Sequence, residues 1–450
     1  MDEDAEGSLR EFAVAVVRRL AGAGHRALFA GGCVRDQLMR VRPKDYDVAT
    51  SARPEQITEL FPRTKLVGVA FGVVRVLGEA PHADAAPFHV EVATFRRESG
   101  YSDGRRPDQV EFADEVEDVR RRDFTINGLL FDPLKRQILD YVGGQADLER
   151  KLVRAIGQAR LRFQEDRLRL LRAVRFAAQL GFEIEGQTFQ AIKEESARVV
   201  QVSAERIRDE LTHMLTGSRP RRAFELMKAA GLLQAILPEV DRMAGVEQPP
   251  EFHPEGDVWT HTLIMLGQLE RAPPALALGV LLHDVAKPAT FERAPDRIRF
   301  SEHEKLGAEM AEQILRRLRF GNEVIGRVTE LVRWHMLFKD IPRMRPARLK
   351  RFLRRDDFED HLELHRLDCV ASHADLESYR FCQAQRAVLP TEQLRPRPLV
   401  NGDDLKSLGL QPGPVFRRIL RDVEDRQLEG TLADRQKALE YVRRKYVERS

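Results

Sequence analysis

Apolar and polar residues alternate along the chain with two different periods, a short one in the first third and a longer one afterwards. The segment F-H-V-E-V-A-T-F at 88–95 alternates with period two, which is typical of a strand that buries one face. Shorter apolar runs between turn residues predict further strands. Strands are predicted at 26–30, 45–50, 65–69, 72–77 and 88–95, and helices at 8–23 and 54–61. These elements predict an α/β domain built on a small mixed sheet.

After about residue 151 the apolar positions follow the period of amphipathic helices. Leu168, Leu171 and Val174, for example, fall on one stripe. Helices are predicted at 161–180, 204–215, 221–230, 263–269, 303–318 and 347–353, with proline-rich breaks at 249–254 and 389–398. The domains predicted from these changes are an α/β head at 1–150, a helical neck at 151–245, a second helical domain at 246–395 and a short tail at 396–450.

Composition limits the kinds of partner that the chain can have. Its 450 residues suffice for two to four domains at about 100–200 residues each. Lys+Arg 74 against Asp+Glu 71 gives a net charge of +3, so a nucleic-acid surface must be a local patch. Of the basic residues 61 are arginine, which reflects either a compositional bias or phosphate binding by the planar guanidinium.

The cysteines and the apolar runs indicate a cellular compartment. Cys33, Cys369 and Cys382 are odd in number and form no C-x-x-C pair, which argues against a disulfide framework and favours the reducing cytoplasm. No apolar run reaches the roughly 18–20 residues that a membrane span needs. We therefore expect a cytoplasmic protein without membrane contact.

A glycine turn followed by two aspartates is the densest chemical signal in the head. Gly31 and Gly32 follow a predicted strand, where the N–H groups of a glycine turn can approach a phosphate closely. Asp45 and Asp47 are two residues apart, so on a strand both carboxylates point to one face and suit Mg²⁺. Glu91, on the alternating strand, offers a third carboxylate, and three carboxylates can hold two metal ions for phosphoryl transfer. Each motif alone is usually only a turn or a solvated strand end, but their combination favours a site.

These motifs resemble the head of the tRNA nucleotidyltransferase and bacterial poly(A) polymerase family, within the polymerase-beta-like nucleotidyltransferases. The matching segments are G-G-C-V-R-D at 31–36, D-Y-D at 45–47, T-F-R at 94–96, Y-S-D-G-R-R-P at 101–107, R-R-D-F-T-I-N-G-L at 121–129 and D-Y-V-G-G at 140–144. One departure is Gly128, where alanine is usual. The resemblance implies a polymerase-beta-like fold for the head.

The resemblance also implies a role for each matching residue. Asp45 and Asp47 would bind Mg²⁺, with Glu91 as the third carboxylate. The nucleotide would be held by Gly31, Gly32 and Arg35 at the triphosphate, and by Arg122, Asp123 and Asn127, which position it and its ribose. Without the resemblance, Arg121 and Arg122 would be interpreted as a solvated basic pair.

The neck contains an acidic and arginine-rich helix opening, E-D-R-L-R, that resembles the family's nucleotide-selecting motif E-D-x-x-R. Arg167 stands where proline is common. Asp166 and Arg169 would read the base, because cytosine and adenine present an amino donor beside a ring-nitrogen acceptor, whereas uracil and guanine present the reverse. Arg172 and Arg175, three and six residues further on, would bind phosphates. The alternative is one exposed, salt-bridged helix face.

A third group of residues lies in the second helical domain. Seven of the 12 histidines fall between His261 and His373, counting both. Six side chains in this region follow the order His, His-Asp, His, His, Asp: His261, His283, Asp284, His303, His335 and Asp368. This order resembles the metal-dependent phosphohydrolases named for their His-Asp pair, the HD domains. Imidazole and carboxylate ligands suit a transition metal such as Ni²⁺, Mn²⁺ or Co²⁺, and such a site would hydrolyse a phosphomonoester or a 2′,3′-cyclic phosphate. The alternative is an inert helical scaffold.

Together these resemblances imply a template-independent nucleotidyltransferase that builds or repairs the C-C-A end of tRNA from CTP and ATP. The expected partner is the tRNA acceptor stem, bound through its backbone, and no obligate protein partner is evident. Three alternatives stay open. They are a poly(A) polymerase or an A-only or CC-only tRNA enzyme of the same family, an HD phosphohydrolase acting on RNA ends, and a non-catalytic tRNA-binding protein.

Overall fold

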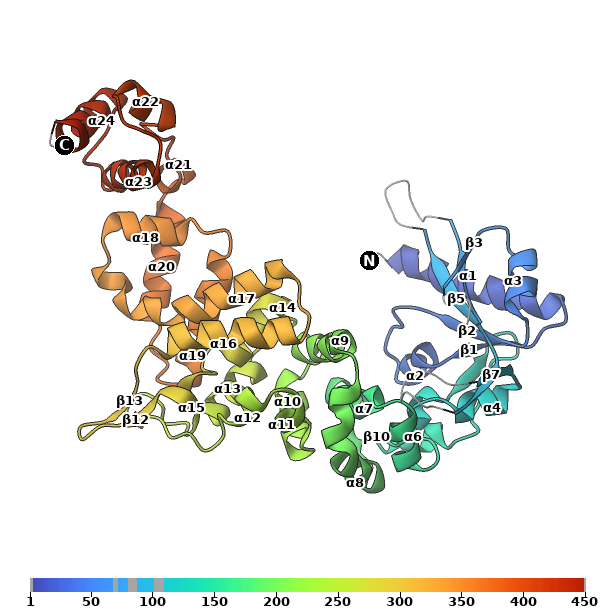
Figure 1. Cartoon of the computed structure of the whole chain (residues 1–450). Helices are drawn as coiled ribbons and strands as arrows, with labels where there is room; N and C mark the ends of the chain where they lie inside the picture. Colours follow the sequence, from blue (N-terminus) through green and yellow to red (C-terminus); the bar gives the residue numbers. More distant parts are fainter. Residues whose placement is uncertain (1–2, 68–71, 80–86, 101–108, 449–450) are drawn as a thin grey trace. The chain divides into compact units, whose positions relative to one another are not determined.

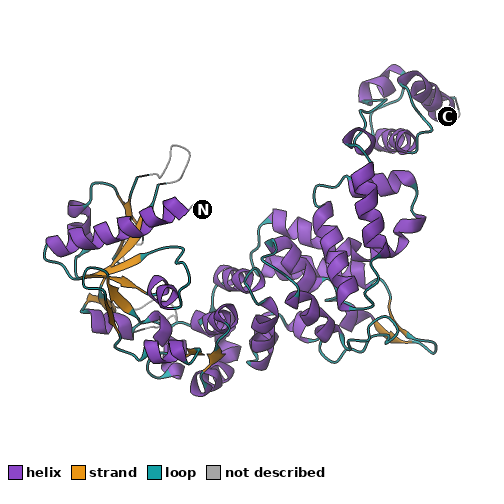
Figure 2. Cartoon of the chain, turned by 180° about the vertical axis from the view of Figure 1, so that it is seen from behind, coloured by secondary structure: helices purple, strands orange, loops and turns teal. Residues whose placement is uncertain are grey.

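The computed structural model of the chain describes residues 3–67, 72–79, 87–100 and 109–448. The chain divides into two compact units, Met1–Pro238 and Glu239–Ser450, and apart from one hairpin the strands belong to the first (Figures 1 and 2). The motif predicted at 101–107 and the end of the strand predicted at 65–69 lie outside the described residues. The division into four domains stays a prediction. None of the helices in the described part of the chain combines the length and apolar character needed to span a bilayer.

A seven-stranded sheet forms the centre of the head, in the order β3-β4-β5-β2-β1-β8-β9. Its strands are β1 (Ala27–Ala30), β2 (Asp47–Thr50), β3 (Thr64–Leu66), β4 (Val73–Leu77), β5 (His89–Thr94), β8 (Leu130–Asp132) and β9 (Gln137–Leu139). Only β2 and β5 pair in parallel, and the other neighbours pair antiparallel. The predicted α/β head with a mixed sheet is confirmed. The prediction that the second strand begins at Asp45 is wrong, because β2 begins at Asp47.

The strand β1, which has a neighbour on each side, is buried along its whole length because both faces of the sheet are covered. Ala27 and Phe29 join one hydrophobic core, together with helices α1 (Glu3–Gly22) and α3 (Pro54–Leu60). Leu28 and Ala30 point the other way and join a second core beside α4 (Glu115–Arg120). This alternation is the period-two geometry of a strand. A strand buried on both faces therefore carries apolar residues at every position.

The remaining elements of the first unit are mainly helical. They are α2 (Gly32–Leu38), β6 (Arg96–Ser99), β7 (Gln109–Phe112), η2 (Thr125–Asn127), α5 (Gly144–Glu149), β10 (Leu152–Val153), α6 (Ala159–Glu165), α7 (Leu168–Leu180), β11 (Glu183–Ile184), α8 (Gly186–Glu195), η3 (Ser196–Gln201), α9 (Ala204–Leu215), α10 (Pro220–Ala229) and α11 (Leu232–Ile236). The single helix predicted at 161–180 is wrong, because the chain breaks between α6 and α7. Asp166 caps the end of α6 with extended backbone, φ −139° and ψ 104°, and its Oδ1 accepts a hydrogen bond from the N–H of Leu168 at 3.1 Å. Aspartate favours such local bonds over continuation of a helix.

The second unit is helical around one wholly apolar helix. Its helices are α12 (Pro238–Asp241), α13 (Val258–Gly267), α14 (Pro274–Leu282), α15 (Lys287–Thr290), α16 (His303–Arg317), α17 (Asn322–Trp334), η4 (His335–Arg343), α18 (Pro346–Leu353), α19 (Phe358–Ala371), α20 (Glu377–Val388), α21 (Thr391–Leu394), α22 (Gly402–Ser407), α23 (Pro414–Leu428), α24 (Arg435–Val442) and the π-helical turn η5 (Arg443–Val447). Every residue of α14 after Pro274 is buried, and α13, α17 and α19 pack against it. A helix that is apolar all round must be buried, so its C-terminal end carries His283 into the interior.

This unit also contains a short hairpin and a capped turn. The hairpin β12 (Phe291–Arg293) and β13 (Ile298–Phe300) was not predicted. A turn precedes α22, where the side chain of Asn401 accepts hydrogen bonds from the N–H groups of Asp403 and Asp404 as an N-cap.

The three cysteines are buried and free. Burial raises the pKa of Cys33, Cys369 and Cys382 alike to about 12, so none of them is a reactive thiolate. The prediction of no disulfide framework is confirmed.

Candidate functional sites in the head and in the second unit

A cavity of about 540 Å³ opens in the first unit, where the glycine turn, strands β2 and β5 and the start of α7 meet. All but one of the residues predicted for the head site line it: Gly31, Gly32, Arg35, Asp45, Asp47, Glu91, Arg122, Asp123, Asn127, Asp166, Arg169 and Arg172. Motifs that are up to 141 positions apart in the chain, from Gly31 to Arg172, therefore share one wall. This convergence is what a binding site requires and what a set of unrelated turns and helix faces does not produce.

Three carboxylates gather on one wall of the cavity. The parallel register of β2 and β5 places Asp47 beside Glu91, and Asp45 lines the cavity from the segment before β2. Burial, followed by the nearby charges of Asp45 and Glu91, raises the pKa of Asp47 to about 6, against the opposing effect of Arg122. Such repulsion between oxygen ligands is relieved by a bound divalent cation, so the donor set fits one. Glu91 also binds Arg75 at 2.6 Å, which offsets part of its charge.

The glycine turn brings backbone close to a basic side chain. Gly31 has a φ of 73°, and a Cβ atom there would lie 3.2 Å from Nη1 of Arg122. Glycine is the residue that adopts this conformation without strain. Arg35, on the first turns of α2, is buried and donates from Nη1 to Oδ1 of Asn127 at 2.8 Å.

Asn127 continues a polar network towards the neck. Its Nδ2 donates to Oδ1 of Asp123 at 3.1 Å, and Oδ2 of Asp123 accepts from Nε and Nη2 of Arg172 at 2.8 and 2.6 Å. Arg35, Asn127, Asp123 and Arg172 thus form one chain of hydrogen bonds along the cavity. A network in which each member has a partner holds its side chains in fixed orientations.

The two arginines that precede Asp123 are anchored, which excludes a solvated basic pair. Arg121 binds Oδ1 of Asp118 at 2.6 Å and Arg122 binds Oδ2 at 3.0 Å. Asp118 is buried. Although its burial acts in the opposite direction, Arg122 and Arg121 hold the pKa of its carboxyl below the ordinary value. Arg121 also lines the cavity, and it was not among the predicted site residues. Its position three residues after Asp118 in α4 is the signal that could have indicated it.

The neck contributes Asp166, Arg169 and Arg172, but the structure does not bring Arg175 to the cavity. Arg175 binds Glu210 at 2.6 Å and Gln179 at 3.2 Å instead. The alternative of one salt-bridged helix face does not hold either, because Asp166 precedes α7.

The ring of Phe176 is a cavity residue that the sequence did not indicate. The guanidinium groups of Arg35, Arg172 and Arg175 lie 5.4, 5.1 and 4.4 Å from its centre. Its aromatic face fixes the arginines by cation–π attraction. At helical spacing an aromatic residue is ordinarily a core residue, so its pattern alone could not reveal this position.

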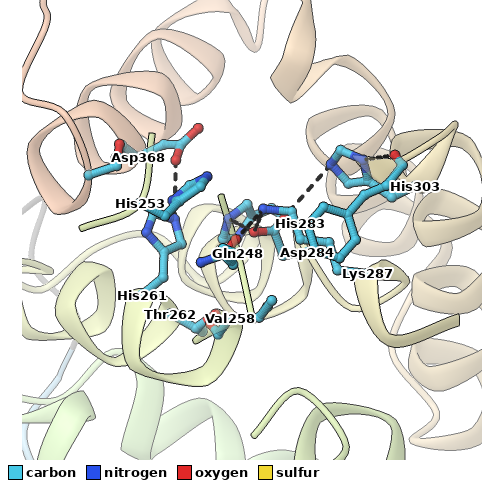
Figure 3. A network of polar contacts seen from close by, with 12 residues as sticks. Gln248, His253, Val258, His261, Thr262, His283, Asp284, Lys287, His303 and Asp368 are labelled. Carbon is cyan, nitrogen blue, oxygen red and sulfur yellow. Dashed lines mark hydrogen bonds and ion pairs between the residues drawn. The ribbon is translucent and has the colours of Figure 1, made fainter. Parts of the chain in front are cut away.

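The second unit brings together all six predicted metal ligands. They come from several places in the helical framework: His261 from α13, His283 and Asp284 from directly after α14, His303 and His335 from the first residues of α16 and η4, and Asp368 from α19. They form two triads whose ligand atoms lie within 4.8 Å of one another, His261–His283–Asp368 and Asp284–His303–His335. Figure 3 shows His261 and Asp368 on one side, His283 and Asp284 in the middle and His303 on the other side.

In three of the four histidines the backbone engages Nδ1 and leaves Nε2 facing the other ligands. Nδ1 of His283, His303 and His335 faces the backbone carbonyl three residues earlier, at 2.9, 2.8 and 2.6 Å. With Nδ1 as the donor, Nε2 of each ring is a lone-pair acceptor. Nε2 of His303 and Nε2 of His335 lie only 3.2 Å apart, and burial, with His303 and His283, lowers the pKa of His335 to about 3. Two facing lone pairs require a cation or a shared proton between them, so this donor set fits a metal ion.

His261 differs from the other three histidines because a carboxylate orients it. Nδ1 of His261 lies 2.7 Å from Oε1 of Glu255, and Nε2 lies 3.1 Å from Oδ1 of Asp368. Although burial opposes it, the hydrogen bonds with Asp368 and Glu255 raise the pKa of His261 to about 9. His253 binds the same carboxylate oxygen at 2.9 Å. Neither His253 nor Glu255 was predicted, because they lie in an irregular proline-rich segment outside the H-HD-H-H-D order.

Both units match known protein families. Residues 27–154 match the model of the poly A polymerase head domain, residues 181–243 match that of the probable RNA and SrmB-binding site of polymerase A, and residues 257–379 match the HD domain. The fold and the carboxylate cavity therefore define a polymerase-beta-like nucleotidyltransferase head. The predicted resemblance to the tRNA nucleotidyltransferase and bacterial poly(A) polymerase family, with an HD domain, is confirmed by these matches.

Two curated relatives of the chain are both CCA-adding enzymes. The chain is 40% identical over 263 residues to the CCA-adding enzyme of Lactobacillus johnsonii and 45% identical over 206 residues to that of Lactiplantibacillus plantarum. These matches cover 56% and 46% of this chain but only 63% and 49% of the two relatives. The chain thus spans less than two thirds of the length of the curated relatives that it matches.

Solved structures extend the likeness over the whole chain. The crystal structure of the Bacillus stearothermophilus CCA-adding enzyme in complex with CTP is 25% identical, with a TM-score of 0.72, and the match covers 100% of this chain and 99% of that one. The Thermotoga maritima CCA-adding enzyme complexed with tRNA is 18% identical, with a TM-score of 0.59 over 98% of this chain and 96% of that one. This second likeness concerns the fold.

Proposed function

We propose that the chain is a template-independent nucleotidyltransferase that builds or repairs the C-C-A end of tRNA from CTP and ATP. The convergence of the predicted head and neck residues on one cavity carries the proposal, and the names of the matched relatives support it. In the reaction the terminal 3′-hydroxyl of the tRNA attacks the α-phosphate of the nucleotide, the new phosphodiester bond forms, and pyrophosphate leaves.

The residues of the chain divide this task between them. Arg35 and Arg122, beside the Gly31–Gly32 turn, bind the triphosphate through charge-assisted hydrogen bonds. Asp123 and Asn127, fixed by their mutual hydrogen bond, position the ribose. Mg²⁺ held by Asp45, Asp47 and Glu91 would supply neutralising charge at the phosphates and activate the attacking hydroxyl.

Base selection falls to the neck, where Asp166 and Arg169 line the cavity. A carboxylate accepts the exocyclic amino group that cytosine and adenine share, and a guanidinium donates to the ring nitrogen beside it. Uracil and guanine would place a carbonyl against the carboxylate. The tRNA acceptor stem is the proposed primer, bound by shape and backbone charge. A cytoplasmic location stays a prediction.

The decisive experiment supplies the purified chain and Mg²⁺ with tRNA ending before C-C-A, after C and after C-C, and with each labelled nucleotide separately. We expect CTP to extend the first two primers, ATP to extend the third, and UTP and GTP to extend none. Incorporation from ATP only would identify an A-only enzyme, and incorporation from CTP only would identify a CC-only enzyme. Synthesis of a long A tract would identify a poly(A) polymerase.

Substitutions test whether the carboxylate wall is the reaction centre. Asp45→Ala or Asp47→Ala should abolish addition while tRNA binding survives, whereas Glu117→Ala, which removes an exposed carboxylate of α4 paired with Arg120, should leave addition unchanged. Near-normal turnover in either aspartate variant would contradict the proposed centre.

A second proposed activity belongs to the HD domain, as a metal-dependent phosphohydrolase acting on RNA 3′ ends. The observation that favours it is the convergence of six ligands, among them His303 and His335, whose Nε2 atoms face each other at 3.2 Å. The adjoining cavity, about 600 Å³, carries basic groups suited to a phosphate, among them Lys287, Arg299 and Lys339. Imidazole ligands favour Ni²⁺, Mn²⁺ or Co²⁺ over Mg²⁺, and the substrate would be a phosphomonoester or a 2′,3′-cyclic phosphate.

This activity is separable from the first. His283→Ala with Asp284→Ala should abolish hydrolysis and leave nucleotide addition intact. His365→Phe is the matched control, because His365 is stacked on Phe338 with ring centres 4.2 Å apart, and the substitution keeps an aromatic ring there. Absence of hydrolysis with each of the three metals in the unmodified chain would leave the domain as a scaffold.

A further inference from the structure

The carboxylate of Asp166, which is proposed to read the base, is hydrogen-bonded by an arginine that does not line the cavity. Nη1 and Nη2 of Arg206, on α9, donate to Oδ1 and Oδ2 of Asp166 at 3.1 and 2.8 Å. This is the two-pronged geometry in which a guanidinium fixes the plane of a carboxylate. Asp166 belongs to the cavity wall and Arg206 does not, so Arg206 acts on a ligand only through Asp166.

The hydrogen bonds of Asp166 leave one acceptor position open. A carboxylate offers about four lone pairs, two on each oxygen. Oδ1 uses both, because it accepts from Arg206 and from the N–H of Leu168 at 3.1 Å. Oδ2 accepts from Arg206 alone among the described residues. One lone pair of Oδ2 therefore stays available for a donor in the cavity.

The hydrogen bonds of the neighbouring Arg169 leave some of its N–H donors open. Its Nη1 donates to the carbonyl of Arg162 at 3.0 Å and to Glu165 at 2.7 Å, and its Nη2 donates to the carbonyl of Arg121 at 2.9 Å. A guanidinium has five N–H groups, so Nε–H and one N–H of Nη2 remain. The wall thus offers one acceptor on Asp166 and donors on Arg169, which is the complement of an amino group beside a ring nitrogen.

We propose that Arg206 is the positioning residue that sets the choice of base, an inference that rests on the proposed nucleotide addition. By fixing both oxygens, Arg206 keeps the open lone pair of Oδ2 directed at the exocyclic group of the base. Cytosine and adenine then gain an aligned hydrogen bond, and uracil and guanine meet a carboxylate oxygen that is unable to turn away from their carbonyl. Without Arg206 the carboxylate is free to rotate. Its hydrogen bond with cytosine or adenine then weakens, and its repulsion from the carbonyl of uracil or guanine decreases.

The test compares Arg206→Gln, Arg206→Lys and Arg222→Gln in the full chain. Arg222 is the matched control because its Nη2 also binds both oxygens of a carboxylate, Glu183, at 2.9 and 2.8 Å, 39 positions away in the chain and on the exposed surface. For each variant, kcat/KM for CTP, ATP, UTP and GTP is measured on tRNA primers, together with equilibrium binding of each nucleotide and the thermal midpoint.

We expect Arg206→Gln to lower the preference for CTP over UTP and for ATP over GTP by roughly tenfold, the effect of one misaligned charge-assisted hydrogen bond. Arg206→Lys, which keeps the charge but not the fork, should recover part of it. Arg222→Gln should keep the preference of the unmodified chain. In an Asp166→Asn background, Arg206→Gln should add little, because the group that it positions is already gone.

Each result separates the two layers of the argument. If the unmodified chain transfers no nucleotide, the proposed function fails. If it transfers selectively and Arg206→Gln keeps that selectivity, only the role of Arg206 is overturned. If Arg206→Gln is too unstable to assay, Arg206→Lys decides alone: unchanged preference with unchanged nucleotide binding overturns the proposal, and reduced preference supports it.

Discussion

Nε and Nη2 of Arg172 both donate to the Oδ2 atom of Asp123, at 2.8 and 2.6 Å, across 49 positions of the chain. Asp123 follows α4 and Arg172 lies in α7, so this contact joins two walls of the cavity that both residues line. Asp123 is 8% exposed. Although burial acts in the opposite direction, Arg172 together with Asn127 keeps the pKa of its carboxyl below the ordinary value.

Removing the arginine should therefore cost more than an ordinary surface substitution. We expect Arg172→Gln to lower the stability of the first unit by about 3–5 kcal/mol, because it leaves a buried carboxylate without its cation. Arg120→Gln breaks an exposed pair with Glu117 and should change stability by less than about 1 kcal/mol. Thermal midpoints by circular dichroism check this, and similar midpoints for the two variants would contradict it.

Repulsion among the carboxylates of the cavity wall should lower the stability of the metal-free protein. Asp47 has a pKa of about 6 in the folded chain, against about 4 for an unfolded aspartate. Its ionisation therefore opposes folding as pH rises from about 4 to 6, and the full cost is present above 6. With a chelator at pH 7.5, Asp47→Asn should be more stable than the unmodified chain by about 1 kcal/mol or less, because water screens the exposed carboxylate, and the gain should vanish near pH 4. Equal midpoints at both pH values would disprove this.

A second acid of the head should behave in the opposite way. The pKa of Asp118 is lowered in the folded chain by Arg122 and Arg121, so its ion pairs contribute stability above about pH 4 that is lost as pH falls through the folded pKa. Asp118→Asn should lower the midpoint at pH 7 by the equivalent of about 3 kcal/mol and should weaken its dependence on pH below 4. The measurement is the midpoint as a function of pH from 2.5 to 7. A variant as acid-sensitive as the unmodified chain would show that other carboxyls control acid unfolding.

Removal of metal should weaken the second unit. Ligand binding to the folded state alone stabilises by about 2.7 kcal/mol at a concentration of 100 times Kd, so extraction with a chelator should lower the midpoint, and Ni²⁺, Mn²⁺ or Co²⁺ should restore it. His335→Ala should remove this response because His335 completes the triad with Asp284 and His303. His365→Phe should keep it. Elemental analysis that finds no transition metal bound to the unmodified chain after reloading would refute the site.

The head site was predictable from the sequence because its chemistry lies in short local motifs. Each motif alone is usually only a turn or a solvated strand end, but the motifs follow one another in the order of a known family. Even there, the strand boundary at Asp47 was not predictable, because Asp45 and Asp47 have the same local spacing on a strand and on extended backbone. The six HD ligands were predictable because their order along the chain, His, His-Asp, His, His, Asp, resembles that of a known family.

The neck was less predictable for two physical reasons. A repeat of three residues turns a helix by about 300°, so each member falls about 60° behind the last, and Arg175 comes to face Glu210 and not the cavity. The break at Asp166 gives no apolar signal, because Arg167 continues the polar pattern of the helix. Partners such as Arg206 and Glu255 come from distant or irregular segments, and no spacing rule connects them with the residues they orient.

The departure at Gly128 has a packing reason that only the fold reveals. A Cβ atom there would lie 2.8 Å from a methyl group of Val142 and 3.2 Å from side-chain atoms of Ile156 and Val119. The space that the usual alanine would need is therefore filled by three branched side chains.

The burial of Cys33, Cys369 and Cys382 controls how readily the native protein reacts with oxidants and alkylating agents. A thiol whose pKa is about 12 is almost wholly protonated at neutral pH, and the thiolate is the species that reacts. The folded chain should therefore titrate close to zero equivalents with a disulfide reagent and three after denaturation. Because Cys33 lies in one compact unit and the other two in the second, the order in which thiols become reactive on heating reports which unit opens first.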